Sequence, residues 1–182
     1  LRRLVHYDYW SDNLRKSILV DSKAELLVYG MGEKPLLEVA TKLKQGNSIE
    51  NIRGTAFAKP IKVFNEKDYP DHIVLDTFKE LTENKNKFID YTKTIEASVN
   101  PYQAKTLIQD NESKVIIVNP PSFPLEEKEI DRIYDLPYTR EPHPRYTDSI
   151  PAYDMIKDSV TIVRGCSGGC SFCSIGLHQG KL

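Results

Sequence analysis

The 182-residue sequence has no long apolar run, no excess of one charge and no cysteine before Cys166. A transmembrane helix needs ~20 apolar residues in a row, and no stretch approaches that length. The first residues do not form a signal peptide either. Lys and Arg number 25 against 26 Asp and Glu, without the basic stripe that binds nucleic acid. We therefore expect a cytoplasmic protein with neither a membrane nor a nucleic-acid partner.

The three cysteines are an odd number within one short loop, which excludes a disulfide framework. Hydrophobic residues make up 40% of the chain and charged residues 28%, the composition of an ordinary globular protein of one domain or two small ones. The sequence does not begin with Met, and its cysteines stand close to its last residue. We therefore expect a segment of a longer protein.

Residues 1–57 have the pattern of the end of an open α/β domain. A helix is expected over residues 11–20, with Ser11 as its N-cap. The apolar run at residues 25–29 predicts a buried strand that ends in a glycine turn. Residues 35–46 predict a helix, because Pro suits a first helical turn and Gly a helix end. The apolar face of this helix is expected to contain Leu36, Leu37, Ala40 and Leu43.

Other residues in this part of the chain are expected to be structural. Tyr7, Tyr9 and Trp10 are predicted to pack against the core rather than to stack on a ligand. The glycine turn at residues 30–32 is a weak phosphate-loop signal, and a plain strand-to-helix turn is the better interpretation.

Residues 58–158 predict a mixed α/β connecting region. Thr77 and Glu80 have the spacing of a capping box, which opens a long helix with apolar residues up to Val99. Shorter patterns predict a strand at residues 115–118, a helix at residues 126–134 and an extended, proline-rich connection at residues 136–151.

The last part of the chain, residues 159–182, combines a predicted strand at residues 159–163 with a cysteine loop. The loop carries Cys166, Cys170 and Cys173 in the spacing C-x3-C-x2-C. Three thiolates this close together can bind one inorganic cluster, and the neighbouring glycines let the backbone curl around it. A 4Fe–4S cubane usually has four cysteine ligands, so three would leave one iron open to a small chelating molecule.

Zinc is the alternative metal for this loop. His178 would complete a Cys3His set, which is a legitimate tetrahedral site and would make the segment a structural or interaction module without catalysis. Substituting His178 separates the two interpretations, because a zinc site should weaken and a three-cysteine cluster should not. Reduced surface thiols without any metal are the third interpretation.

The motif C-x3-C-x-aromatic-C after a predicted strand resembles the signature of the radical S-adenosylmethionine (SAM) superfamily. The resemblance implies that Cys166, Cys170 and Cys173 bind a 4Fe–4S cluster and that Phe172 lies on the adenine side of SAM. It implies reductive cleavage of SAM to methionine and a 5′-deoxyadenosyl radical, which abstracts hydrogen from a substrate. An electron donor such as flavodoxin or ferredoxin is the partner that this chemistry implies.

The wider sequence is similar to the YgiQ-type radical SAM family, over residues 18–34, 119–121, 136–144 and 160–180. This resemblance implies a Rossmann-like, cobalamin-binding-type domain that ends near residue 57, and a (β/α) barrel that begins at residue 159. Only 16 residues follow Cys166, whereas a full barrel takes about 200 or more. We therefore expect the chain alone to be inactive, with a substrate that its residues do not identify. No D-x-H-x-x-G motif supports cobalamin binding within it.

Overall fold

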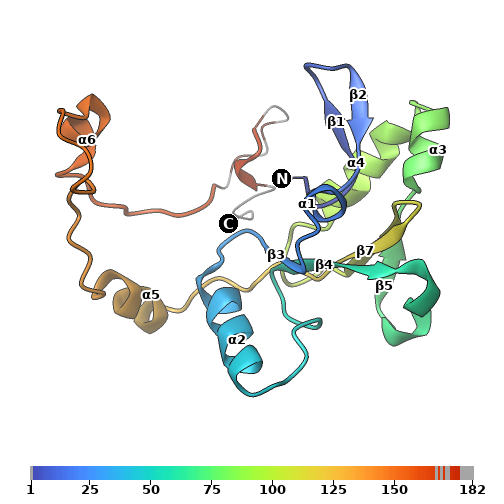
Figure 1. Cartoon of the computed structure of the whole chain (residues 1–182), viewed down its shortest axis with the longest axis horizontal. Helices are drawn as coiled ribbons and strands as arrows, with labels where there is room; N and C mark the ends of the chain where they lie inside the picture. Colours follow the sequence, from blue (N-terminus) through green and yellow to red (C-terminus); the bar gives the residue numbers. More distant parts are fainter. Residues whose placement is uncertain (1, 167, 169, 171–172, 177–182) are drawn as a thin grey trace. The chain divides into compact units, whose positions relative to one another are not determined.

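The computed structural model describes residues 2–166, 168, 170 and 173–176. The chain divides into two compact units, Leu1–Pro124 with Gly165–Leu182, and Leu125–Arg164. Figure 1 shows the helices and strands of each unit. Among the helices of the described residues, none combines the length and the apolar character that crossing a bilayer requires.

A five-stranded sheet lies at the centre of the first unit (Figure 1). Its strands are, in spatial order, β3 (Leu26–Val28), β4 (Thr55–Pro60), β7 (Lys114–Val118), β6 (Thr106–Asp110) and β5 (His72–Val74). Neighbouring strands are antiparallel except β5 and β6, which are parallel. The strand predicted at residues 115–118 is confirmed as the central strand β7, where a continuous apolar run is buried on both faces.

Apolar side chains pack in two clusters around this sheet. Side chains alternate along a strand, so Ile116 and Val118 belong to one cluster while Val115 and Ile117 belong to the other. The first cluster takes further side chains from α1 (Ile18–Ser22), α3 (Phe78–Glu83) and α4 (Lys87–Ala97). The second and smaller cluster includes Tyr69, which follows the short 3-10 helices Ile61–Val63 and Glu66–Asp68.

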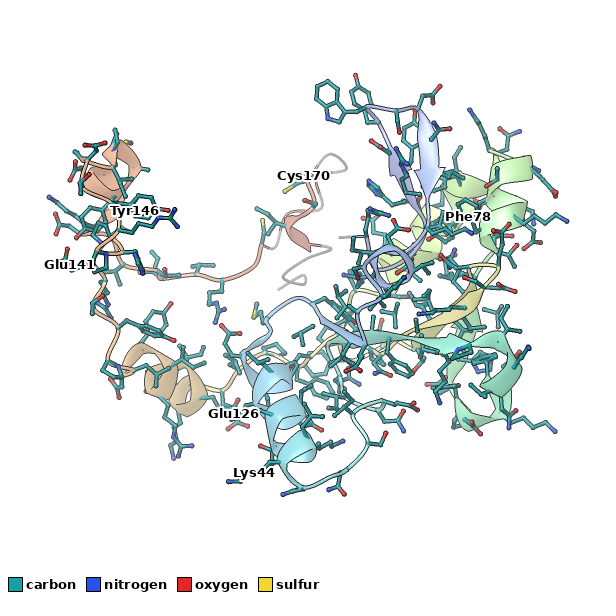
Figure 2. The ribbon with its side chains drawn as sticks, viewed as in Figure 1. Lys44, Phe78, Glu126, Glu141, Tyr146 and Cys170 are labelled. Atoms are coloured by element: carbon teal, nitrogen blue, oxygen red, sulfur yellow. The ribbon has the colours of Figure 1, made fainter. Side chains whose placement is uncertain are left out.

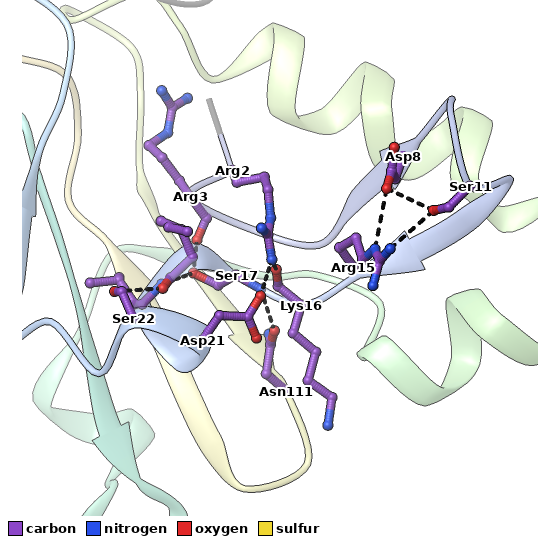
Figure 3. Close-up of polar contacts among 12 residues, drawn as sticks. Arg2, Arg3, Asp8, Ser11, Arg15, Lys16, Ser17, Asp21, Ser22 and Asn111 are labelled. Atoms are coloured by element: carbon purple, nitrogen blue, oxygen red, sulfur yellow. Dashed lines mark hydrogen bonds and ion pairs between the residues drawn. The ribbon is translucent and has the colours of Figure 1, made fainter.

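Buried hydrogen bonds attach the N-terminal segment to this core. The fully buried Gln109 of β6 accepts the Val5 N–H through its side-chain oxygen at 2.9 Å. Ser17, also fully buried, donates its hydroxyl to the Arg3 carbonyl at 2.5 Å and its N–H to Asn111 Oδ1 at 3.1 Å (Figure 3). A buried polar group left without a partner costs about 1–3 kcal/mol, so these bonds fix the path of the chain before α1.

The first residues form a hairpin of β1 (His6–Asp8) and β2 (Asn13–Arg15), so the helix predicted for residues 11–20 is wrong. The Asp8 carboxylate holds the turn, because it accepts the Ser11 hydroxyl at 2.7 Å and lies 3.3 Å from Arg15 Nε (Figure 3). Local bonds of this kind compete with helical hydrogen bonds. The helix that follows, α1, begins with Ser17 as its N-cap rather than Ser11.

The strand predicted at residues 25–29 and the helix at residues 35–46 are confirmed as β3 and α2 (Glu33–Lys44). The strand that follows α2 is β4, and it pairs antiparallel with β3. Strands joined through a crossover helix in a Rossmann-type unit are parallel instead. The Rossmann-like description of residues 1–57 is therefore not confirmed, and the unit is a mixed α/β fold.

The apolar face predicted for α2 is exposed. Leu36 and Leu37 are 60% and 70% exposed, whereas the helix buries Pro35 and Val39. The buried side packs closely against Gly54, where an added Cβ would stand 2.8 Å from Pro35 Cγ. The absence of a Cβ at this position therefore allows the Pro35 side of the helix to face inward.

The capping box of Thr77 and Glu80 is confirmed, but the long helix predicted after it is divided into α3 and α4. Asn84 leaves the helical conformation, and its side chain accepts the Asn86 N–H at 3.1 Å. An Asn side chain that bonds to the backbone two residues on favours a turn over a continuing helix.

The second unit contains α5 (Glu127–Tyr134) and α6 (Pro151–Ile156). The helix predicted at residues 126–134 is confirmed as α5, which begins with a capping box between Glu126 and Glu129. Of the connection expected at residues 136–151, residues 136–150 contain neither helix nor strand, and Pro151 begins α6.

The strand predicted at residues 159–163 is wrong for this chain. These residues have no regular structure, and the side chains of Val160 and Ile162 are 80% and 89% exposed. A strand requires a neighbour that pairs with its N–H and C=O groups. No ladder partner for these residues occurs in the described part of the chain.

Candidate metal centre

The cysteine loop presents free thiols in a tight bend. Cys166 and Cys170 are exposed, and Cys173 is half-buried. The bend begins at Gly165, whose φ of +94° is rarely adopted by residues with a Cβ. It continues where the Cys173 N–H donates to the Cys170 carbonyl at 3.1 Å. A backbone hydrogen bond therefore links the second and third cysteines.

Gly168 lies beside the sulfurs of the first two cysteines. Its N–H donates to Cys166 Sγ at 3.3 Å. A Cβ added to this glycine would stand 3.3 Å from Cys166 Sγ and 3.7 Å from Cys170 Sγ. Both sulfurs therefore border the side of Gly168 on which a side chain would lie, and the absence of a Cβ leaves room beside them. The space beside the two sulfurs suits an anionic iron–sulfur group. The N–H donor suits it too, because the sulfurs of such a group accept hydrogen bonds.

The structure does not assemble the complete set of ligands. Among the described residues, no three Cys, His, Asp or Glu side chains are placed so that they could hold a metal ion. Phe172, the predicted SAM contact, and His178, the alternative zinc ligand, lie outside the described residues. The three-cysteine set therefore stays a prediction from the sequence spacing, and the geometry at Gly168 fits it.

A cavity of about 560 Å³ lies beside the β1–β2 hairpin. Its lining residues come from the hairpin and from the region of α3 and α4: Tyr7, Asp12, Asn13, Leu14, Phe78, Thr82, Lys85 and Phe88. Tyr9 and Trp10, which we expected to pack, are 79% and 93% exposed at the hairpin tip. No sequence signal pointed to this cavity, because it exists only once residues 6–15 form a hairpin.

The buried ionisable groups Arg3 and Tyr29 support the fold rather than a reaction. The Arg3 guanidinium lies 4.1 Å from the centroid of the Tyr29 ring, and the Tyr29 hydroxyl donates to the Asn119 carbonyl at 2.5 Å. Burial raises the pKa of Tyr29 to about 12, and burial also lowers the pKa of Arg3. The phenol thus stays protonated at neutral pH and cannot serve there as a base.

Comparisons with known proteins identify the family. The Radical SAM N-terminal family model matches residues 1–159. Similar relatives are UPF0313 proteins from Methanocella arvoryzae, Geobacter sulfurreducens (GSU2873) and Bacteroides thetaiotaomicron, at 45%, 44% and 46% identity. Each alignment covers 100% of this chain but only 30%, 30% and 31% of the relative. No solved structure matches the chain. The chain belongs to the Radical SAM N-terminal family, and its resemblance to YgiQ-type radical SAM proteins is confirmed.

Proposed function

We propose that this chain supplies the cluster-binding loop of a radical SAM enzyme, with Cys166, Cys170 and Cys173 as ligands of a 4Fe–4S cluster. The observation that carries the proposal is the space at Gly168. The sulfurs of Cys166 and Cys170 border this space, and the Gly168 N–H donates a hydrogen bond to Cys166 Sγ. Family membership supports it, because the match to the Radical SAM N-terminal model ends at residue 159, shortly before the cysteine loop.

The chain's own residues would bind and orient the cluster. Three thiolates would leave one iron without a protein ligand, and this iron would be free to bind the amino and carboxylate groups of SAM. The Gly168 N–H stabilises negative charge on the Cys166 sulfur, and Phe172 is the proposed contact for adenine. When bound, such a cluster supplies the electron that splits SAM into methionine and a 5′-deoxyadenosyl radical for hydrogen abstraction.

The remaining parts of the active site belong to the longer parent protein. We propose that a (β/α) barrel of the whole protein begins near residue 159, although residues 159–163 form no strand in this chain. The chain spans about three-tenths of the length of its curated relatives. The substrate, the remaining SAM contacts and an electron donor such as flavodoxin or ferredoxin are therefore assigned to the whole protein, and this chain alone is expected to be inactive.

Zinc binding by a Cys3His set is the less favoured function. It would make the loop a structural module, whereas the match to the Radical SAM N-terminal family model supports an iron–sulfur cluster instead. The two metals differ in their need for His178, which zinc requires as its fourth ligand and a three-cysteine cluster does not.

Anaerobic reconstitution with iron and sulfide tests the proposal. We expect bound iron and an electron paramagnetic resonance signal of a reduced cubane that changes when SAM is added. Cys170→Ala should abolish the signal, and the matched variant His178→Ala should retain it. Bound zinc without a cluster signal, lost on substitution of His178, would replace this proposal with the zinc site.

A further inference from the structure

Two exposed aromatic side chains stand at the tip of the β1–β2 hairpin. Trp10 is 93% exposed and Tyr9 is 79% exposed, and their rings meet edge to face with centroids 6.1 Å apart. The turn below them is held firmly, because the Asp8 carboxylate accepts the Trp10 N–H at 3.1 Å and the Ser11 hydroxyl at 2.7 Å. Trp and Tyr on a preorganised support are the residues most enriched at the energetic centres of protein interfaces.

The cavity beside this hairpin can accept aromatic side chains. Its volume of about 560 Å³ is in the ordinary range of binding pockets. Leu14 of the hairpin, Phe78 of α3 and Phe88 of α4 give it apolar walls, and Figure 2 shows Phe78 beside the hairpin. The exposed side chains of Tyr9 and Trp10 and an apolar cavity therefore lie next to each other on the surface of the first unit.

The polar residues of the cavity carry opposite charges. Asp12 accepts a hydrogen bond from the Tyr7 hydroxyl at 2.7 Å, and Lys85 lies in the turn between α3 and α4. Neither side chain makes an ion pair within the described part of the chain. Each charge is thus available to a partner that presents the opposite charge at the matching place.

We propose that the occupant of this cavity is the hairpin tip of a second copy of the chain. A two-fold interface uses the same surface on both subunits. That surface must therefore carry a protruding group, a cavity that can receive it, and charges of opposite sign. The hairpin surface supplies all three: Trp10 and Tyr9 enter the partner's cavity, while Asp12 meets Lys85 across the two-fold axis, twice. This dimer does not involve the cysteine loop and does not depend on the proposed cluster.

The area available is enough for a specific interface. A buried Trp or Tyr removes about 150–250 Å² from water. The four aromatic side chains of two tips would bury about 600–1,000 Å². The cavity walls that receive them bring the total to just above about 1,000 Å², the lower end of the range of specific interfaces. Contacts of the two aromatic tips alone would fall short of that range, so the cavity is a necessary part of the interface.

Sedimentation of the chain over a range of concentrations, together with its fluorescence, tests the proposal. Trp10 is the only tryptophan, so the emission of the protein describes this one side chain. We expect a concentration-dependent dimer whose formation shifts the emission to shorter wavelength. Tyr9→Ala should raise the dimer dissociation constant at least about tenfold. Leu37→Ala, which removes an exposed leucine of α2, is the matched control and should leave the constant unchanged.

Charge reversal tests the reciprocal geometry. Asp12→Lys alone and Lys85→Glu alone should each weaken self-association, because each places two like charges opposite each other in the homodimer. A mixture of the two variants should restore association, since both pairs are again of opposite charge. Lysine is tolerated in the backbone conformation of position 12, as Lys23 shows with a φ of +57° against +49° for Asp12. Circular dichroism of each variant confirms that it is folded.

Three outcomes would overturn the proposal. The first is a wild-type monomer at every concentration. The second is a short-wavelength Trp10 emission in a monomer, which would mean that Trp10 is buried within its own chain and not in the cavity of a second copy. The third is a dimer that neither Tyr9→Ala nor the charge reversals weaken, which would place the interface elsewhere.

Discussion

Replacing Gly168 with alanine is the most direct perturbation of the candidate cluster loop. The new Cβ would stand 3.3 Å from Cys166 Sγ, a contact tighter than most carbon–sulfur approaches, and 3.7 Å from Cys170 Sγ. The methyl group would therefore occupy the space that we assign to the cluster. To relieve the contact, the loop would have to move the Gly168 N–H away from the sulfur to which it donates at 3.3 Å.

The expected loss follows from the role of groups that orient metal ligands. Removing such a group typically costs tenfold to hundredfold in metal affinity, which is about 1.4–2.8 kcal/mol. Gly168→Ala should thus lower the iron bound at limiting iron after anaerobic reconstitution, without a change in the unfolding midpoint of the apoprotein. Ser174→Ala, which alters an exposed residue just after the last cysteine, is the matched control and should bind iron as the wild type does.

Equal iron affinity of Gly168→Ala and the wild type would refute this reasoning, because the glycine would then border no part of the cluster. Loss of iron in Ser174→Ala to the same extent would also refute it, since any change in the loop would then have the same effect.

Three further predictions concern stability, each measured by urea denaturation. Ile116→Ala should lower the free energy of unfolding by about 2–5 kcal/mol, because this fully buried side chain lies on the central strand. Thr77→Ala should cost about 1 kcal/mol by removing the N-cap of α3, whereas Thr82→Ala on the exposed surface of the same helix should cost less. The bond from the Thr77 N–H, and then Lys87, lowers the pKa of Glu80 from 4.5 to about 2. The stability that this carboxylate contributes is therefore complete above about pH 4.5 and is lost as the pH falls towards about 2. Glu80→Gln should flatten the dependence of the free energy of unfolding on pH in that range. An unchanged dependence would contradict this role of Glu80.

The elements that the sequence predicts correctly are those specified by short-range chemistry. The capping box at Thr77, the proline and glycine around α2 and the apolar run of β7 each involve neighbouring residues. The hairpin was missed because Leu14 and Ile18 have helical spacing, while the turn depends on the side-chain bonds of Asp8.

The relations that could not be predicted depend on residues far apart in the chain. The direction of β4 relative to β3 is set by its pairing with β7, about sixty residues later, rather than by the helix between them. The prediction of a strand at residues 159–163 is wrong for a similar reason. These residues are rich in β-branched side chains, but no strand in the described part of the chain pairs with them. For the site, spacing predicted three cysteines, and only the structure placed Gly168 beside two of their sulfurs.

The bond between Val5 and Gln109 has a consequence for the order of folding. Its two residues are 104 positions apart, and the Tyr91 hydroxyl, which donates to the Val5 carbonyl at 2.9 Å, is 86 positions away. During synthesis the N-terminal segment leaves the ribosome first, yet its acceptor on β6 emerges more than a hundred residues later. Contacts of such long sequence separation form slowly. The segment around Val5 is therefore among the last parts of the unit to reach its native position, although it is made about a hundred residues before β6. Trp10 stays exposed throughout that interval.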